Sequence, residues 1–220
     1  GYRGSWTPAL QFDLSYFHLN YADRIGTVAQ KRPDKSIYQY RTNLGTSISR
    51  GFEGYVEVDP ITAIFESSRV GYLHLFASIA FVDATYGDFE VTTVSNGQVQ
   101  IRNLEGNRVE NAPRKINRFG ATYSYNRFSM TWQLSDIGEA YSDASNTVAP
   151  NAAATVGLIP AYRVQDLSAS WNFWKQHSIK AGVNNLTDAR YFTRRAGGYP
   201  GPGIMPADGR TFYLTAALKF

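Results

Sequence analysis

Hydrophobic and polar residues alternate with a period of two along most of the chain. In the segment RVQDLSASWNF, single polar residues separate the apolar positions Leu167, Ala169, Trp171 and Phe173. The final segment, RTFYLTAALKF, keeps the pattern up to Phe220. Such alternation predicts β-strands with one face in an apolar environment and the other in a polar one. We predict eight antiparallel strands, at residues 10–28, 36–59, 70–84, 115–126, 128–138, 162–174, 178–186 and 211–220.

The connections between these strands are short and long in turn. Short turns are expected near residues 59–69, 126–127 and 175–177. Long loops rich in Gly, Pro and Asn are expected at residues 31–45, 87–115, 137–162 and 187–210. Short turns on one rim and long loops on the other are typical of bacterial outer-membrane barrels. We therefore expect the long loops to share one rim, with Phe220 at the other.

The two faces of the predicted strands suit two different solvents. The polar face is mostly Ser, Thr, Asn, Gln and Gly, which fits a wet lumen better than the charged outer face of a soluble sandwich. The apolar face carries aromatic residues near the strand ends, as at membrane interfaces. Phe76 and Ala80 are exceptions, because they fall on the polar face. The predicted fold class is all-β, an antiparallel transmembrane β-barrel.

The composition narrows the possible functions. The 220 residues include no cysteine, which excludes disulfides, thiolate metal sites and a catalytic thiol. The net charge of +4 comes from scattered Lys and Arg residues, so nucleic-acid binding is not indicated. The three histidines, His18, His74 and His177, lack metal-ligand spacing. We expect no metal site, no catalytic residue and no enzymatic activity.

Several segments resemble the C-terminal part of TonB-dependent outer-membrane receptors. They are TNLGTSISRGFEGYVEVDP, APRKINRFGATY, VNNLTDARYF and RTFYLTAALKF, in the order and spacing of that family. Three more segments, SDASNT, GLIPAYRVQDLSASW and YFTRRAGGYPGPGIMPADGRTFY, are most similar to the ferric dicitrate receptor branch. One departure is Thr187, where many members have an aromatic residue.

The resemblance implies that residues 1–220 are the C-terminal part of a barrel of about 22 strands, about eight of which this chain supplies. An N-terminal plug domain, absent from these residues, would fill the complete barrel in the bacterial outer membrane. The complete protein would bind a ferric chelate, ferric dicitrate or another siderophore, and import it when TonB acts on the plug. Iron would travel as the bound chelate, with no cofactor. The alternative is a self-contained small outer-membrane barrel with a structural or adhesive role, whose loops bind a partner or lipopolysaccharide.

The candidate ligand contacts lie in the long loops. A ferric citrate complex is anionic, and guanidinium groups match carboxylates in a two-pronged geometry. The candidates are Arg194, Arg195, Tyr199 and Arg210 in the last loop, and Arg32, Gln39 and Arg41 in the first. Lys31, Arg102 and Arg108 have the same interpretation. The alternative for each arginine is pairing with Asp188 or Asp208, or with lipopolysaccharide phosphates.

Two further sets of polar residues are expected to be structural. Arg50 and Glu53, in the segment RGFE, resemble a family motif near the top of a strand. We predict a lumenal ion pair between Glu53 and an Arg or Lys on a neighbouring strand, and contact with ligand or plug is the alternative. Asn184, Asn185 and Asp188 are expected to end a strand through bonds from side chain to backbone.

Overall fold

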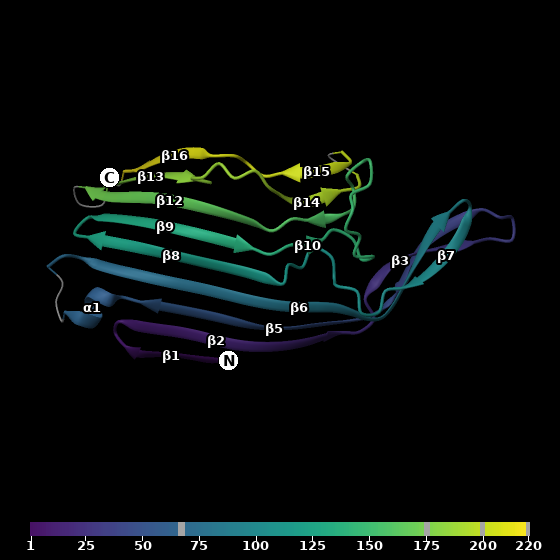
Figure 1. Ribbon diagram of the computed structural model, residues 1–220, viewed down its shortest axis with the longest axis horizontal. Coiled ribbons are helices and arrows are strands. Elements are labelled where there is room, and N and C mark those ends of the chain that lie inside the picture. Colours follow the sequence, from purple (N-terminus) through teal and green to yellow (C-terminus); the bar gives the residue numbers. More distant parts are fainter. Residues whose placement is uncertain (66–68, 174–176, 199–200, 219–220) are drawn as a thin grey trace.

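The computed structural model describes residues 1–65, 69–173, 177–198 and 201–218. Most of them form one large sheet in which every paired strand is antiparallel to its neighbour (Figure 1). In sheet order the strands are β1 (Tyr2–Thr7), β2 (Leu10–Tyr21), β5 (Gly45–Val58), β6 (Tyr72–Ser95), β8 (Lys115–Tyr125), β9 (Phe128–Ile137), β12 (Tyr162–Phe173), β13 (His177–Asn184) and β16 (Thr211–Ala217). Sheet order follows chain order, as in a barrel wall built from successive hairpins.

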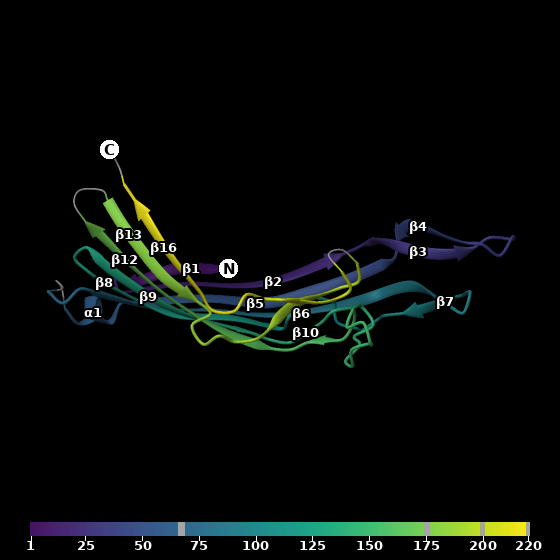
Figure 2. The ribbon, with the colours of Figure 1, turned by 90° about the horizontal axis from the view of Figure 1, so that it is seen from above.

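The sheet is curved and open. Figure 2 shows it bent like a trough, with β16 rising along one side. Among the described residues, β1 pairs with β2, β16 pairs with β13, and no bond joins β1 to β16. A small barrel closed on itself requires that last pairing, so the structure has the form of a section of barrel wall.

The strand register confirms the predicted division into two faces. Residues directly opposite each other in an antiparallel pair share a face. One apolar row crosses four strands, at Ala121, Trp132, Leu167 and Val183. The adjacent row is polar or small, at Thr122, Thr131, Ser168 and Gly182. We call the first face outward and the second lumenal.

Aromatic residues gather at both ends of the outward face. Near the short turns, one set of rings lies in register, and we call it the turn-side belt: Tyr125, Phe128 and Trp171. Toward the long loops, a second set forms the loop-side belt: Tyr16, Phe52 and Phe81. All six side chains are between 41% and 66% exposed, which suits rings at a membrane interface.

Phe76 and Ala80, the two exceptions to the alternation, lie on the lumenal face as predicted. The position of Phe76 is explained by its packing. The ring of Phe76 covers Gly120 on the neighbouring strand, in the space that a side chain at position 120 would need. Phe17 covers Gly51 on the next strand in the same way. A glycine opposite an aromatic residue therefore lets a large ring lie flat on the lumenal wall.

Two predicted strands are divided, and their outer parts form a separate hairpin. The strand predicted at 10–28 becomes β2 and β3 (Ile25–Lys31), and the one predicted at 36–59 becomes β4 (Ile37–Asn43) and β5. Asp23 and Gly45 have positive φ angles, 54° and 140°, which change the chain direction between the parts. β3 and β4 then pair with each other and project beyond the sheet (Figure 2).

The prediction of a long loop at residues 87–115 was largely wrong. β6 continues to Ser95, turns at Asn96 and Gly97, and returns as β7 (Gln98–Asn103). Both turn residues have positive φ, 51° and 68°, as a two-residue hairpin turn requires. Short strands also occupy the other long loops, namely β10 (Ala140–Tyr141), β11 (Leu158–Ile159), β14 (Phe192–Ala196) and β15 (Gly203–Pro206). The edge strand β1 was not predicted.

The prediction that the long loops share one rim is confirmed (Figure 1). The opposite rim holds the short turns and α1 (Pro60–Ile64), whose first N–H groups, of Ile61 and Thr62, donate to Asp59 Oδ1 at 2.9 and 3.0 Å. Ala217, opposite Ser178, ends β16 at this rim, whereas Phe220 and most of the turn predicted at 175–177 lie outside the described residues. No helix in the described part of the chain has the length and hydropathy to cross a membrane.

Candidate functional site

The base of the last long loop is closed by Asn185, which is 3% exposed. Its amide nitrogen donates to the carbonyls of Ala189 and Asp208 at 2.9 and 3.2 Å, and its amide oxygen accepts the Ala189 N–H at 2.8 Å. Its own N–H donates to Asp166 Oδ1 at 2.9 Å. The prediction that Asn185 ends its strand by bonding to the backbone is confirmed. The side chain of Asn184 bonds to another side chain instead of the backbone, because its amide donates to the Thr211 hydroxyl at 3.3 Å.

Asp188 ties the end of the same loop to its beginning. Its Oδ1 accepts the N–H of Arg210 at 2.9 Å, and its Oδ2 lies 3.3 Å from Arg190 Nη2. The Arg210 N–H and the charge of Arg190 hold the pKa of Asp188 below its usual value. The predicted pairing of Arg210 with Asp188 is thus made by the backbone. The Arg210 side chain is exposed and bonds to no described residue.

The neighbours Arg194 and Arg195 on β14 have different surroundings. Arg195 donates to the carbonyls of Ala154 and Leu158, both at 3.0 Å, and its guanidinium lies 4.9 Å from the centroid of the Phe192 ring. It therefore fastens the β14–β15 hairpin to the preceding loop. Arg194 is exposed and bonds to no described residue through its side chain. Tyr199 lies outside the described residues.

The first-loop candidates lie on an arm formed by β3 and β4 together with the end of β6 and β7 (Figure 1). Arg32 stacks on Tyr38, with its guanidinium 4.7 Å from the ring centroid. Gln39 and Arg41 are exposed on β4. Figure 1 shows the arm and the β14–β15 hairpin at different parts of the loop rim, so the described structure does not bring the two sets of candidates together.

A small packed core anchors the arm to the sheet. Tyr86, Phe89 and Leu104 are 3%, 7% and 2% exposed and contact one another. The Arg24 guanidinium lies 5.3 and 5.9 Å from the centroids of the two rings. Burial and a hydrogen bond from its hydroxyl to Glu110 raise the pKa of Tyr86. The alternation pattern gives no sign of this role for Arg24, because it depends on contacts far along the chain.

A groove of about 820 Å³ lies between the two hairpins of the arm. Its charged lining residues are Asp23, Lys31, Asp88 and Glu90. Lys31 donates through Nζ to the carbonyl of Gly97 at 3.3 Å. Three carboxylates against one ammonium give this groove the wrong charge for an anionic chelate.

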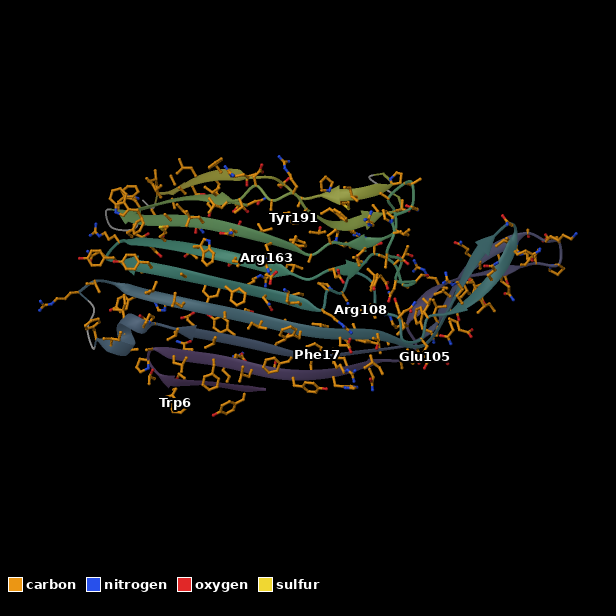
Figure 3. The ribbon with its side chains drawn as sticks, in the orientation of Figure 1. Trp6, Phe17, Glu105, Arg108, Arg163 and Tyr191 are labelled. Atoms are coloured by element: carbon orange, nitrogen blue, oxygen red, sulfur yellow. The ribbon has the colours of Figure 1, made fainter. Side chains whose placement is uncertain are left out.

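The two second-loop arginines also differ from each other. Arg102 is exposed on β7, opposite Val91. Arg108, which Figure 3 shows near the base of the arm, donates to the Ala112 carbonyl at 3.3 Å, and its N–H donates to Asn146 Oδ1 at 2.7 Å. Arg108 therefore links two long loops and contributes to their structure.

Arg50 and Glu53 lie on opposite faces of β5. Arg50 is on the outward face, with its Nη2 3.2 Å from Asp83 Oδ2. Glu53 is lumenal, but the residues opposite it are Ser15 and Ala80. The ion pair predicted for Glu53 is absent from the described structure because neither neighbour carries a charge. Within the described residues, no three His, Cys, Asp or Glu side chains gather as metal ligands.

A curved antiparallel sheet with a wet face, an outward face bounded by aromatic belts, and long loops on one rim defines a section of outer-membrane-type barrel wall. The family model for the β-barrel of TonB-dependent receptor-like proteins matches residues 1–186. The chain belongs to this family, whose members are outer-membrane receptors and transporters.

Individual relatives agree with this assignment. The probable TonB-dependent siderophore receptor PiuA of Acinetobacter baumannii is 27% identical over 179 residues, which cover 75% of this chain and 22% of PiuA. The crystal structure of the unliganded ferric citrate transporter FecA matches with a TM-score of 0.74 at 21% identity, over 97% of this chain and 29% of FecA. The structure of A. baumannii PiuA matches with a TM-score of 0.66 at 20% identity, over 94% of this chain and 26% of PiuA. These structural likenesses show the fold, and the chain spans less than a third of each relative.

Proposed function

We propose that the complete receptor imports an anionic ferric chelate, ferric dicitrate or another siderophore, across the bacterial outer membrane. FecA is a ferric citrate transporter and PiuA a probable siderophore receptor, and both support this class of ligand. The observation that carries the proposal is a set of exposed guanidinium groups at the loop end. Arg41, Arg194 and Arg210 are exposed, and their side chains bond to no described residue.

The chemistry of these groups suits a chelate coated with carboxylates. A guanidinium donates two parallel hydrogen bonds to one carboxylate, and it keeps its charge at any physiological pH. Arg195 acts differently in this proposal, since its bonds to two carbonyls hold the hairpin that carries Arg194. We expect Arg194 and Arg210 to contact the ligand and Arg195 to position Arg194.

The remaining parts of the transport cycle lie outside this chain. An N-terminal plug would fill the complete barrel, and TonB, driven by the proton-motive force, would act on that plug. The chelate would then pass along the lumenal wall, which combines Ser and Thr rows with a few charged residues such as Arg118 and Asp166. Iron stays in its chelate throughout as the transported cargo.

The test is to replace Arg41, Arg194, Arg195 and Arg210 by Gln, one at a time, in the full-length receptor and to measure ferric citrate binding. A charge-assisted bond is worth about 1.5–3 kcal/mol, so loss of a contacting arginine should weaken binding roughly tenfold to a hundredfold. The effect should shrink at high salt. Arg127→Gln is the matched control, because Arg127 is exposed in a short turn at the opposite rim.

Assembly must be measured beside binding. Arg195→Gln is expected to loosen the β14–β15 hairpin, so that its weaker binding comes with a less stable loop. If the variants of Arg194, Arg195 and Arg210 all assemble and bind like the parent, the last loop is not the anion site. The arm, with Arg32, Gln39 and Arg41, would then be the better candidate.

A further inference from the structure

Three hydrogen bonds join the two hairpins of the arm along the groove between them, which we call the arm groove. At the base, the N–H of Glu90 donates to the Leu44 carbonyl at 3.1 Å. Halfway along, the N–H of Ala29 donates to the Thr92 hydroxyl at 2.5 Å. At the tip, Lys31 Nζ donates to a carbonyl of the β6–β7 turn at 3.3 Å. The shape of the groove, about 820 Å³ in volume, is therefore fixed by contacts within the arm.

The arm groove is acidic. Asp23, Asp88 and Glu90 line it, and with Lys31 they give a net charge of −2, from three carboxylates and one ammonium. All three acidic residues are exposed. Within the described part of the chain, their carboxylates form no ion pair and no side-chain hydrogen bond. They are therefore available to pair with cations of a ligand.

The strands of the arm also give the groove apolar walls. Val28 and Tyr40 lie opposite each other on β3 and β4, and Val99 and Ile101 are alternate residues of β7. The side chains of Tyr40 and Ile101 are 43% and 66% exposed. Apolar positions that repeat at every second residue suit a ligand with the same repeat, as in an extended peptide.

β4 and β7 are edge strands to which a peptide can be added. In the described structure β4 pairs only with β3, and β7 pairs only with β6. The free edge of each strand offers a row of backbone N–H and C=O groups. Extended peptides bind such edges as an additional strand, with affinity from the main chain and specificity from the side chains. The seven residues of β3 span about 23 Å, which gives room for an extended segment of about six residues.

We propose that the arm groove binds an extended, basic segment of a protein outside the cell. The three carboxylates pair with Lys or Arg side chains of the segment, the apolar walls receive its alternate residues, and β4 or β7 supplies the main-chain bonds. The negative charge that disfavours an anionic chelate selects such a segment. A small cation would use the carboxylates alone and leave the walls and strand edges unused. The position outside the cell rests on the outer-membrane location of the proposed function, and the inference is independent of which chelate is transported.

The experiment measures binding of labelled hexapeptides to the purified full-length receptor by fluorescence anisotropy. A peptide of alternating lysine and valine should bind, and a peptide of alternating glutamate and valine should not. Asp88→Asn and Glu90→Gln should each weaken binding of the lysine peptide about two- to fivefold, as expected for exposed ion pairs. Ile101→Thr should weaken it several-fold through the lost apolar contact. Glu105→Gln is the matched control, because Glu105 is exposed at the base of the arm (Figure 3) and does not line the groove.

Two further measurements separate recognition from damage to the arm. Replacing Asp88 and Glu90 together by Lys changes the net charge of the groove from −2 to +2, so this variant should bind the glutamate peptide and lose the lysine peptide. Methylation of the valine nitrogens in one lysine peptide, and of the lysine nitrogens in another, should lower their affinities unequally. Alternate N–H groups of an added strand point to the same side, so only one of the two sets bonds to the receptor.

The proposal is overturned if the parent receptor does not bind the lysine peptide, or if Glu105→Gln weakens binding as much as the groove variants do. Equal affinities of the two methylated peptides overturn it as well, since they exclude addition of a strand to β4 or β7. Displacement of the lysine peptide by an equal concentration of spermidine also overturns it, because it indicates a site for small cations. Ferric citrate binding should stay at the parent level in Asp88→Asn and Glu90→Gln, which separates this test from that of the proposed function.

Discussion

Replacing Leu167 by Arg tests which solvent meets each face of the wall. Leu167 lies opposite Trp132 and Val183 on the outward face. It is four residues from Arg163, which pairs with Asp136 toward the long loops, and four from Trp171 of the turn-side belt, so it lies near the middle of the apolar band between them. An arginine facing lipid at the midplane costs about 2–4 kcal/mol in outer-membrane barrels. We expect Leu167→Arg to lower the free energy of unfolding by that amount.

The adjacent residue supplies the contrast. Ser168 lies opposite Thr131 and Gly182 on the lumenal face, where an arginine stays in water. Ser168→Arg should therefore change the free energy of unfolding by less than about 1 kcal/mol. Two further outward positions test how the cost of an arginine depends on its depth in the membrane. Ala169→Arg is closer to the turn-side belt, and Leu134→Arg is two residues from Asp136, so both should cost less than Leu167→Arg.

The assay is urea unfolding of the full-length receptor in phospholipid bilayers, with the free energy obtained by linear extrapolation. Alanine at positions 167 and 168 corrects for the side chain that is removed. Equal costs for arginine on the two faces would refute the assignment of lipid and lumen. A larger cost at Leu134 than at Leu167 would refute the position of the apolar band on the strands.

Two other predictions concern the base of the last loop. Asn185→Ala removes three side-chain bonds and should lower the free energy of unfolding by about 1–3 kcal/mol, whereas Thr187→Ala at an exposed position should be neutral. The pKa of Asp188 is lowered by folding, so its stabilising effect is complete above the unfolded value of about 3.9 and is lost as the pH falls through the lower folded pKa. Protection of the Arg210 N–H from hydrogen exchange, corrected for the intrinsic rate, should therefore fall only below about pH 4, and Asp188→Asn should remove this pH dependence.

The wall of the barrel was predictable because its signal is local. A strand between lipid and water must alternate, and a shift of one residue would turn every side chain to the wrong solvent. The alternate residues Phe119, Ala121, Tyr123 and Tyr125 of β8 therefore lie opposite Leu134, Trp132, Met130 and Phe128 of β9. The exception at Phe76 is different, because it depends on Gly120, which lies opposite it on another strand.

The arm was missed although part of its signal was in the sequence. The dipeptide of Asn96 and Gly97 lies between the alternating segments EVTTVS and QVQIRN, which is a strong indication of a two-residue hairpin turn. The prediction of a long loop after residue 87 did not take this turn into account. The breaks at Asp23 and Gly45 lie beside a contact between segments distant in sequence, because the guanidinium of Arg24 lies near the rings of Tyr86 and Phe89.

In the candidate site, residue type alone does not predict the role of an arginine. Arg194 and Arg195 are neighbours with the same chemistry, yet Arg195 donates to two carbonyls of another loop and Arg194 faces solvent. Arg50 is a further case, because it resembles part of a family motif but pairs with Asp83 on the outward face. An arginine can bind a ligand, pair with a carboxylate or hold a loop. Its role depends on which acceptors the register and the loop contacts bring within about 3 Å. For this chain, these contacts make Arg195 structural and pair Arg50 with Asp83, whereas contact of Arg194 and Arg210 with the chelate is our proposal.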